Sequence, residues 1–331
     1  MIKLPEFNDE EWYLEEIIKL FTDGRHSKEK REKELKEKKI KIYEVFEEIG
    51  LKEVLAEEEK DPLEQLILIP FSGLKQIYVK IKEKGYDFKE KYKENGKEKE
   101  RLKEGWQYIY DVYDKLVSHK INVELVHRYG IRSCPYCNEN YIFNRNKSAV
   151  AQLDHFYPRS VYPIFSVCLY NLVPACSACN NKKEEKEIGI SPHDNLCDFS
   201  NLKITYMPKS ANWLDDEQEL EIKFSYSEKD LTFKNEMGKN LKEMKIDVAY
   251  RNHTDYLQEI LKKAQIYNKE NRNNLLLDFP DLFSSDDELL RILFGNYITE
   301  QELLKRPLAK LTRDILKGDV GGGKHKRKII K

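Results

Sequence analysis

Apolar residues recur at helical spacing through the first 129 residues, which predicts an N-terminal helical region. Residues 14–21 present one apolar face, and Asp61 followed by Pro62 is typical of a helix start. A 3.6-residue period continues over residues 102–116, and a short helix is expected at 123–129. The stretch 27–50 is dense in lysine and glutamate. We interpret it as a solvated helix with i,i+4 charge pairs rather than as a nucleic-acid arm.

A different pattern begins beyond Gly189 and predicts a C-terminal region over residues 191–317. Polar and apolar residues alternate at 204–207, 220–226 and 231–233, as expected of short strands. Helical patterns return at 254–264 and 307–316, with capping boxes at Ser285/Glu288 and Thr299/Glu302 between them. Three glycines then precede the sequence KHKRKIIK, so residues 318–331 are expected to form a flexible basic tail with salt-sensitive affinity for nucleic acid.

Composition restricts the class of protein. The chain has 331 residues, which suggests about two domains. A hydrophobic content of 40% excludes general disorder, and a charged content of 35% favours solvated helices. No apolar run approaches the ~18 residues of a membrane span, and the first residues lack the order of a signal peptide. We therefore expect a cytoplasmic protein without a membrane partner.

The central segment, residues 130–190, differs from its surroundings because charges thin out and Cys, Pro, Asn and aromatics replace them. The chain as a whole has a net charge of −1. Residues 131–183 nevertheless contain six basic and two acidic side chains, a local charge of +4. Such a basic segment is compatible with a phosphate-bearing partner.

Four of the six cysteines form two C-x-x-C pairs, Cys134/Cys137 and Cys176/Cys179. Two such pairs beside turn-forming residues predict a tetrahedral, structural zinc site, because four thiolates leave no open position for catalysis. An iron–sulfur or redox role is the less favoured alternative, since no ferredoxin spacing is present. Cys168 and Cys197 are interpreted as small buried hydrophobic residues.

An Asp154-His155 pair lies between the two cysteine pairs. Neighbours on a strand point to opposite faces, so a core strand would have to bury one of two strongly polar groups. A strand that ends at a metal and phosphate site removes this conflict. The other histidines have no comparable setting and are interpreted as surface or hydrogen-bonded residues.

The segment resembles the HNH endonucleases. Their pattern matches Cys134 to Cys137, then Asp154-His155-Phe156-Tyr157-Pro158-Arg159-Ser160, then Asn171, then Cys176 to Lys183. About 50 of the 331 residues are covered. The resemblance implies a predominantly helical α+β chain with a small zinc-stabilised ββα-metal core at 130–190. Residues 155–171 would form the loop between its two strands, residues 172–175 its second strand, and 177–187 its helix.

The resemblance also implies roles for individual residues. His155 would be the general base, Asp154 and Asn180 would hold Mg²⁺ or Mn²⁺, and Asn171 would orient His155. Many family members carry histidine where this chain has Asn180, and a neutral amide favours Mg²⁺ or Mn²⁺ over Zn²⁺. Phosphate contacts are expected from two basic residues, Arg159 and Lys183.

The expected activity is hydrolysis of phosphodiester bonds in DNA. The phrases CPYCNENYI, LDHFYPRSVYP and RPLAKLTRDI are similar to HNH proteins that accompany ATPases in Septu-type bacterial anti-phage defence. This similarity implies an ATPase partner. The chain itself lacks a phosphate-binding G-x-x-x-x-G-K-[ST] loop, so any dependence on ATP would have to come from that second protein. One site cuts one strand, so double-strand cleavage would need an oligomer or rebinding. The alternative is a non-catalytic zinc-knuckle module that binds nucleic acid or protein.

Overall fold

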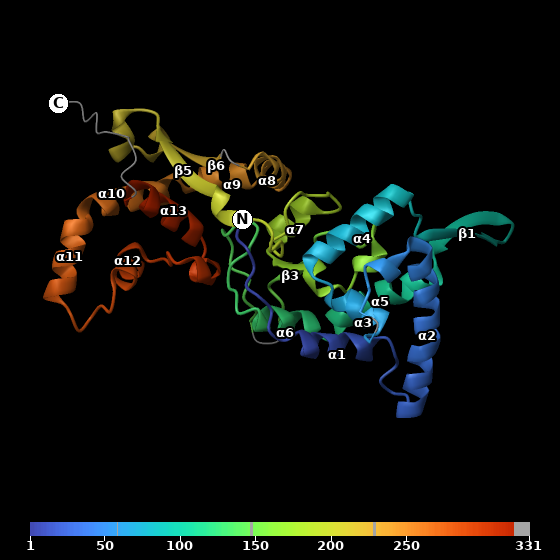
Figure 1. The fold of residues 1–331 in the computed structure, drawn as a ribbon. Helices are drawn as coiled ribbons and strands as arrows, with labels where there is room; N and C mark the ends of the chain where they lie inside the picture. The colour runs from blue at the N-terminus through green and yellow to red at the C-terminus, as the bar shows by residue number, and fades with distance from the viewer. Residues whose placement is uncertain (58, 146–147, 228–229, 321–331) are drawn as a thin grey trace. The chain divides into compact units, whose positions relative to one another are not determined.

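A computed structural model describes residues 1–57, 59–145, 148–227 and 230–320 (Figure 1). The chain is mostly helical, and its described strands form three two-stranded sheets. It divides into two compact units. One comprises Met1–Ile2, Arg132–Tyr141 and Asp198–Lys331, and the other comprises Lys3–Ile131 and Ile142–Cys197. The second, called here the pocket unit, unites the predicted N-terminal helices with most of the segment that resembles a nuclease.

Six helices precede the pocket unit's central strands. Their buried faces follow the predicted apolar spacing, with Ile17, Ile42, Leu74, Trp106 and Ile109 fully buried. The charged run predicted as a solvated helix is a single helix capped by Ser27. The six helices are α1 (Glu10–Leu20), α2 (Lys28–Ile49), α3 (Pro62–Leu68), α4 (Phe71–Lys84), α5 (Glu104–Ser118) and α6 (Ile121–Arg128).

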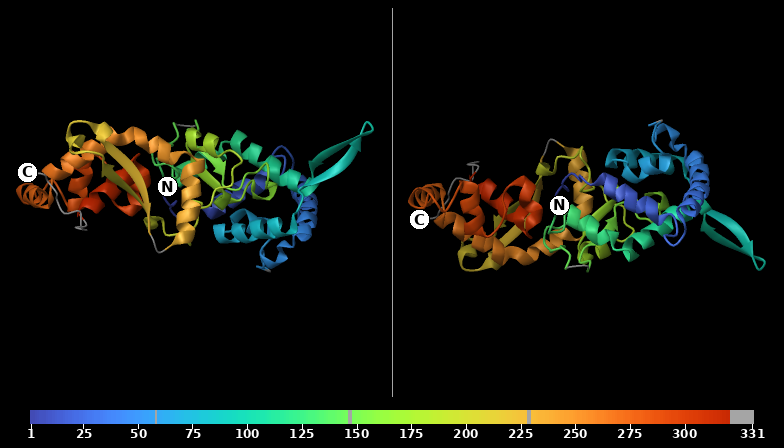
Figure 2. Two further views of the ribbon diagram at one scale, coloured as in Figure 1. Left: turned by 90° about the horizontal axis from the view of Figure 1, so that it is seen from above. Right: turned by 90° about the horizontal axis from the view of Figure 1, so that it is seen from below.

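The prediction that this N-terminal region is wholly helical is wrong at residues 89–102. Strands β1 (Lys89–Glu94) and β2 (Lys97–Leu102) form an antiparallel hairpin there, which extends away from the helices of its unit in both views of Figure 2. Asn95 and Gly96 both have positive φ, 51° and 76°, as a two-residue type I′ turn requires. Charged side chains on both faces conceal the alternation that ordinarily identifies a strand.

The centre of the pocket unit is a strand–loop–strand–helix segment. Strand β3 (Gln152–His155) pairs antiparallel with β4 (Leu172–Ala175), and α7 (Ser177–Lys183) follows directly. The predicted second strand is therefore confirmed at its predicted residues. The predicted helix is shorter than expected, because Glu184 adopts a φ of +49° and ends it.

In its described residues, the other unit contains a longer hairpin and six α-helices. Strands β5 (Leu202–Pro208) and β6 (Leu220–Tyr226) confirm two predicted strands. The strand predicted at 231–233 is wrong, because Asp230 accepts a hydrogen bond from the Phe233 amide at 2.8 Å and starts a helix there. The helices are α8 (Leu231–Glu243), α9 (Ile246–Tyr250), α10 (Thr254–Ile266), α11 (Lys269–Asp278), α12 (Asp286–Phe294) and α13 (Ala309–Val320).

Among the described residues, no helix combines the length and apolar character needed to span a bilayer. The predicted basic tail lies, from residue 321 onward, outside the residues that the structure describes.

Candidate functional site

The four predicted zinc ligands come together. The Sγ atoms of Cys134, Cys137, Cys176 and Cys179 all lie within 4.8 Å of one another, and all four residues are buried. Four converging thiols form the donor set that zinc takes in structural sites. The cluster could therefore hold a metal such as zinc, and it has no fifth His, Cys, Asp or Glu ligand among the described residues.

The first cysteine pair is held by Asn138, which is fully buried and has a φ of +53°. Its backbone amide donates to the Cys134 carbonyl at 2.7 Å, which closes the knuckle turn. Its side-chain amide donates to the carbonyls of Leu303 and Arg306, and its side-chain oxygen accepts from the Lys310 amide. One asparagine thus ties the knuckle to the RPLAK segment that the sequence singled out.

Asp154, His155, Arg159 and Asn180 line one pocket of about 360 Å³ in the pocket unit. Asp154 and His155 come from the end of β3, and Asn180 comes from α7. These residues are separated in sequence, and the antiparallel pairing of β3 with β4 brings α7 back beside β3. The remaining lining residues are Tyr113, Leu153, Pro158, Ser160, Asn181, Glu184 and Glu185.

His155 has a fixed orientation. Its Nε2 lies 2.9 Å from the Ser166 carbonyl oxygen, which can only accept a hydrogen bond. Nε2 therefore carries the hydrogen, and Nδ1 is the basic nitrogen. Burial, aided by the charges of Arg159 and Lys183, lowers the pKa of His155 to about 3. The ring is therefore neutral at physiological pH. The Tyr113 ring packs edge-on against it at 4.4 Å between centroids.

Lys183 lies elsewhere than predicted. It is fully buried, and its Nζ donates to Asp154 Oδ1 at 3.2 Å and to the His155 carbonyl at 2.5 Å. An ammonium in this position neutralises a carboxylate that would be costly to bury alone. The expectation that Lys183 contacts phosphate is thus corrected. The exposed neighbour Lys182 and the buried Lys183 look alike in sequence, but α7 turns them to opposite sides.

Asn171 is fully buried and does not line the pocket. Its side-chain oxygen accepts from the Tyr157 amide at 2.8 Å, and its amide donates to the carbonyls of Tyr157 and Phe165. Phe165 directly precedes Ser166, whose carbonyl holds His155. Asn171 therefore acts on His155 through the loop that it closes, and we describe it as a positioning residue.

Side-chain contacts fix Asn180 and Arg159 at the pocket: a neutral amide holds Asn180, and two tyrosine rings and a carboxylate hold Arg159. The Asn180 Nδ2 donates to Gln152 Oε1 at 2.8 Å, so the amide oxygen is the atom of this side chain that could bind a metal ion. The Arg159 guanidinium lies 4.5 and 4.6 Å from the ring centroids of Tyr110 and Tyr113, and it donates to Asp114 at 2.9 Å. A guanidinium fixed on three sides is preorganised for an anion.

Sequence reasoning missed several residues of the pocket. Tyr113 fits the apolar period of α5, which does not distinguish it from a core residue, yet it contacts both His155 and Arg159. Glu184 and Glu185 belong to a charged run without positional information.

Comparisons with protein families, with curated proteins and with solved structures found no match.

Proposed function

We propose that this chain is a metal-dependent endonuclease of the HNH type that hydrolyses phosphodiester bonds in DNA. The observation that carries the proposal is the meeting of Asp154, a neutral His155 and Asn180 in one pocket beside the fixed Arg159 guanidinium. A zinc-knuckle module that only binds has no need of this combination. The described order of strand, loop, strand and helix agrees with the ββα core that the resemblance implies.

In the proposed reaction, His155 Nδ1 takes a proton from a water molecule as its oxygen attacks phosphorus. The bond from phosphorus to the 3′ oxygen breaks, and the leaving oxygen receives a proton from solvent. Arg159 binds a non-bridging phosphate oxygen and stabilises the developing charge. Asp154 and Asn180 supply the hard oxygen donors that Mg²⁺ or Mn²⁺ prefers, and such an ion supplies charge stabilisation when bound.

We also propose a biological setting, in which this chain is the nuclease effector of a bacterial anti-phage defence system and acts with an ATPase partner. It rests on the similarity of short phrases in the sequence. Co-expression with a neighbouring ATPase gene followed by size-exclusion chromatography tests this part alone, and separate elution would remove it while leaving the nuclease proposal intact.

Cleavage of supercoiled plasmid in Mg²⁺ is the main test, with His155→Ala and a matched control, His127→Ala, at an exposed histidine of the same unit. His155→Ala is expected to reduce the rate by roughly 10²–10⁴-fold, the usual contribution of a general base. The control should retain the wild-type rate. Equal rates for wild type and His155→Ala would remove His155 from the mechanism and favour the binding-module alternative.

A further inference from the structure

Helix α11 buries a charged side chain, whereas its leucines are half-buried or exposed. Its buried side chain is Arg272, whereas Leu277 is 77% exposed. In the turn after the helix, Phe279 and Leu282 are 49% and 63% exposed. Surface helices ordinarily show the opposite arrangement, with apolar residues inward and charges outward. A group of large apolar side chains in solvent is characteristic of a surface that another molecule covers.

Arg272 fixes the orientation of α11 through its hydrogen bonds. Its Nε and Nη2 donate to the two carboxylate oxygens of Asp286 at 2.7 and 3.2 Å, and its Nη1 donates to the Tyr267 carbonyl at 2.9 Å. A two-pronged, part-buried ion pair of this kind fixes orientation as well as distance. It sets α11 against the start of α12, so the exposed leucine and phenylalanine belong to an element with a defined place.

The surroundings of these apolar residues are acidic. Residues 273–290 contain five carboxylates and no Lys or Arg. Asp286 pairs with Arg272 and Glu288 pairs with Arg291. Residues 272–291 still carry a net charge of −3, and their carboxylates other than Asp286 are Asp278, Asp281, Asp287 and Glu288. This charge repels nucleic-acid phosphates and anionic lipids, and it attracts cations. We call Leu277, Phe279 and Leu282, together with these four carboxylates, the α11–α12 surface.

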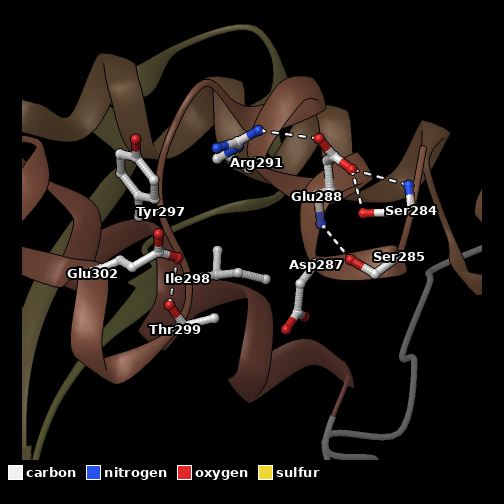
Figure 3. A pocket seen from close by; sticks show the side chains of 9 residues that line it. All are labelled: Ser284, Ser285, Asp287, Glu288, Arg291, Tyr297, Ile298, Thr299 and Glu302. Carbon is white, nitrogen blue, oxygen red and sulfur yellow. Dashed lines mark hydrogen bonds and ion pairs between the residues drawn. The ribbon is translucent and has the colours of Figure 1, made fainter. Parts of the chain in front are cut away.

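A pocket of about 230 Å³ lies beside the start of α12 and is lined on its other side by residues 297–302 (Figure 3). Asp287, Glu288, Glu302 and Arg291 line it. Glu288 pairs with Arg291 at 3.3 Å and Glu302 pairs with Lys305 at 2.9 Å, so Asp287 is the carboxylate most available to a basic side chain. Ser284 donates to Glu288 from both its amide and its hydroxyl, at 2.9 and 2.6 Å, so that this carboxylate is held in place. Ser284, at the edge of the pocket, follows Leu282 by two residues in the chain.

We propose that the α11–α12 surface binds an amphipathic basic segment of a protein partner. The apolar side chains of that segment cover Leu277, Phe279 and Leu282, and its Lys or Arg side chains pair with the carboxylates of the surface and the adjoining pocket. The charge of the surface favours this occupant over nucleic acid or an anionic membrane. The proposal stands on the exposed residues of α11 and α12 and is independent of the proposed nuclease activity.

The test measures binding of a fluorescently labelled, synthetic 14-residue helical peptide of leucine and lysine to the full chain. Fluorescence anisotropy at low and high salt reports the binding. We expect saturable binding that weakens at least tenfold in the variant Leu277→Ser/Phe279→Ser/Leu282→Ser. Asp281→Asn/Asp287→Asn should weaken binding as well and reduce its salt dependence. The matched control, Leu231→Ser, changes another exposed leucine of the same unit, 66% exposed, and should leave affinity unchanged.

Three further measurements can overturn the proposal. A peptide of leucine and glutamate that binds equally well would show that charge does not select the occupant. Concentration-dependent self-association, measured by light scattering and abolished by the triple serine variant, would make a second copy the occupant. Binding to vesicles containing phosphatidylglycerol that requires the three apolar residues would make the occupant a membrane. Circular dichroism of each variant verifies that it folds.

Discussion

Lys183 and Asp154 form an ion pair in the interior of the pocket unit, with 3.2 Å between Nζ and Oδ1 and side-chain exposures of 0% and 3%. Lys183 also donates to the His155 carbonyl. One side chain therefore anchors the last two residues of β3, which are the two that the nuclease proposal places at the reacting phosphate. The pair links stability to the site, because a change at Lys183 leaves a buried carboxylate and a buried carbonyl without this donor.

Replacing Lys183 tests this link. Lys183→Met should lower the free energy of unfolding by roughly 3–5 kcal/mol, since removing one partner leaves the other charge uncompensated. Lys182→Met, at the exposed neighbouring position, should change it by less than about 0.5 kcal/mol. Urea unfolding measures both. The double variant Lys183→Met/Asp154→Asn should recover part of the loss, and strict additivity of the two single changes would contradict the pairing.

The cysteine cluster makes a second prediction. Cys134→Ser and Cys176→Ser should each lose bound zinc and become sensitive to protease, because zinc binding contributes folding free energy, of order 10 kcal/mol in small peptides. Cys197→Ser, outside the cluster, should keep both metal and protease resistance. Elemental analysis and limited proteolysis provide the readouts. A fully folded, metal-free Cys134→Ser protein would contradict a structural four-thiolate site.

The part of the site that could be predicted from sequence is the part with rigid spacing. The C-x-x-C pairs indicated the cysteine cluster, and the polar pair Asp154-His155 indicated a strand end. Strand β3 does end at this pair, although it includes His155, which was expected to begin the loop. Asn171 was expected to orient His155, and its bonds to the Tyr157 and Phe165 backbone explain how it can do so from outside the pocket. Short-range geometry of this kind is encoded locally.

The errors occurred where tertiary packing decides a residue's surroundings. Lys183 is basic and follows Lys182, and only the position of α7 against β3 shows that it is buried. Tyr113 keeps the helical period of a core residue, yet its ring lies between Arg159 and His155. The hairpin at 89–102 does carry a local signal, since Asn95-Gly96 is a strong type I′ turn sequence.

Acid should destabilise the fold through its buried histidines. Burial lowers the pKa of His193 to about 4, so as pH falls below about 6.5 the unfolded chain binds a proton that the folded chain does not. Stability is therefore present at neutral pH and is lost as pH falls from about 6.5 toward 4, with a slope of up to about 1.4 kcal/mol per pH unit for this group. Urea unfolding at several pH values should show a shallower slope for His193→Gln than for wild type. The exposed-site variant His127→Gln should keep the wild-type slope, and an unchanged slope in His193→Gln would contradict the assignment.

Variants of Asp154 and His155 should lose DNA cleavage in different ways if the two residues have the proposed roles. His155→Ala removes the proton acceptor and leaves both oxygen donors, so Mg²⁺ should still bind while cleavage falls by roughly 10²–10⁴-fold at every Mg²⁺ concentration. Asp154→Ala removes a metal ligand, so its residual cleavage should rise as Mg²⁺ is increased into the high millimolar range. Titrating Mg²⁺ against plasmid cleavage, with bound Mg²⁺ measured by calorimetry, separates the two cases. Asp154→Ala also removes the partner of Lys183. Asp154→Asn serves as the matched variant, because its amide oxygen stays near the ammonium but binds Mg²⁺ more weakly than a carboxylate, so its cleavage should also rise with Mg²⁺, at lower concentrations than that of Asp154→Ala. If His155→Ala and Asp154→Asn responded identically to Mg²⁺, the assignment of base and metal ligand to these two residues would be wrong.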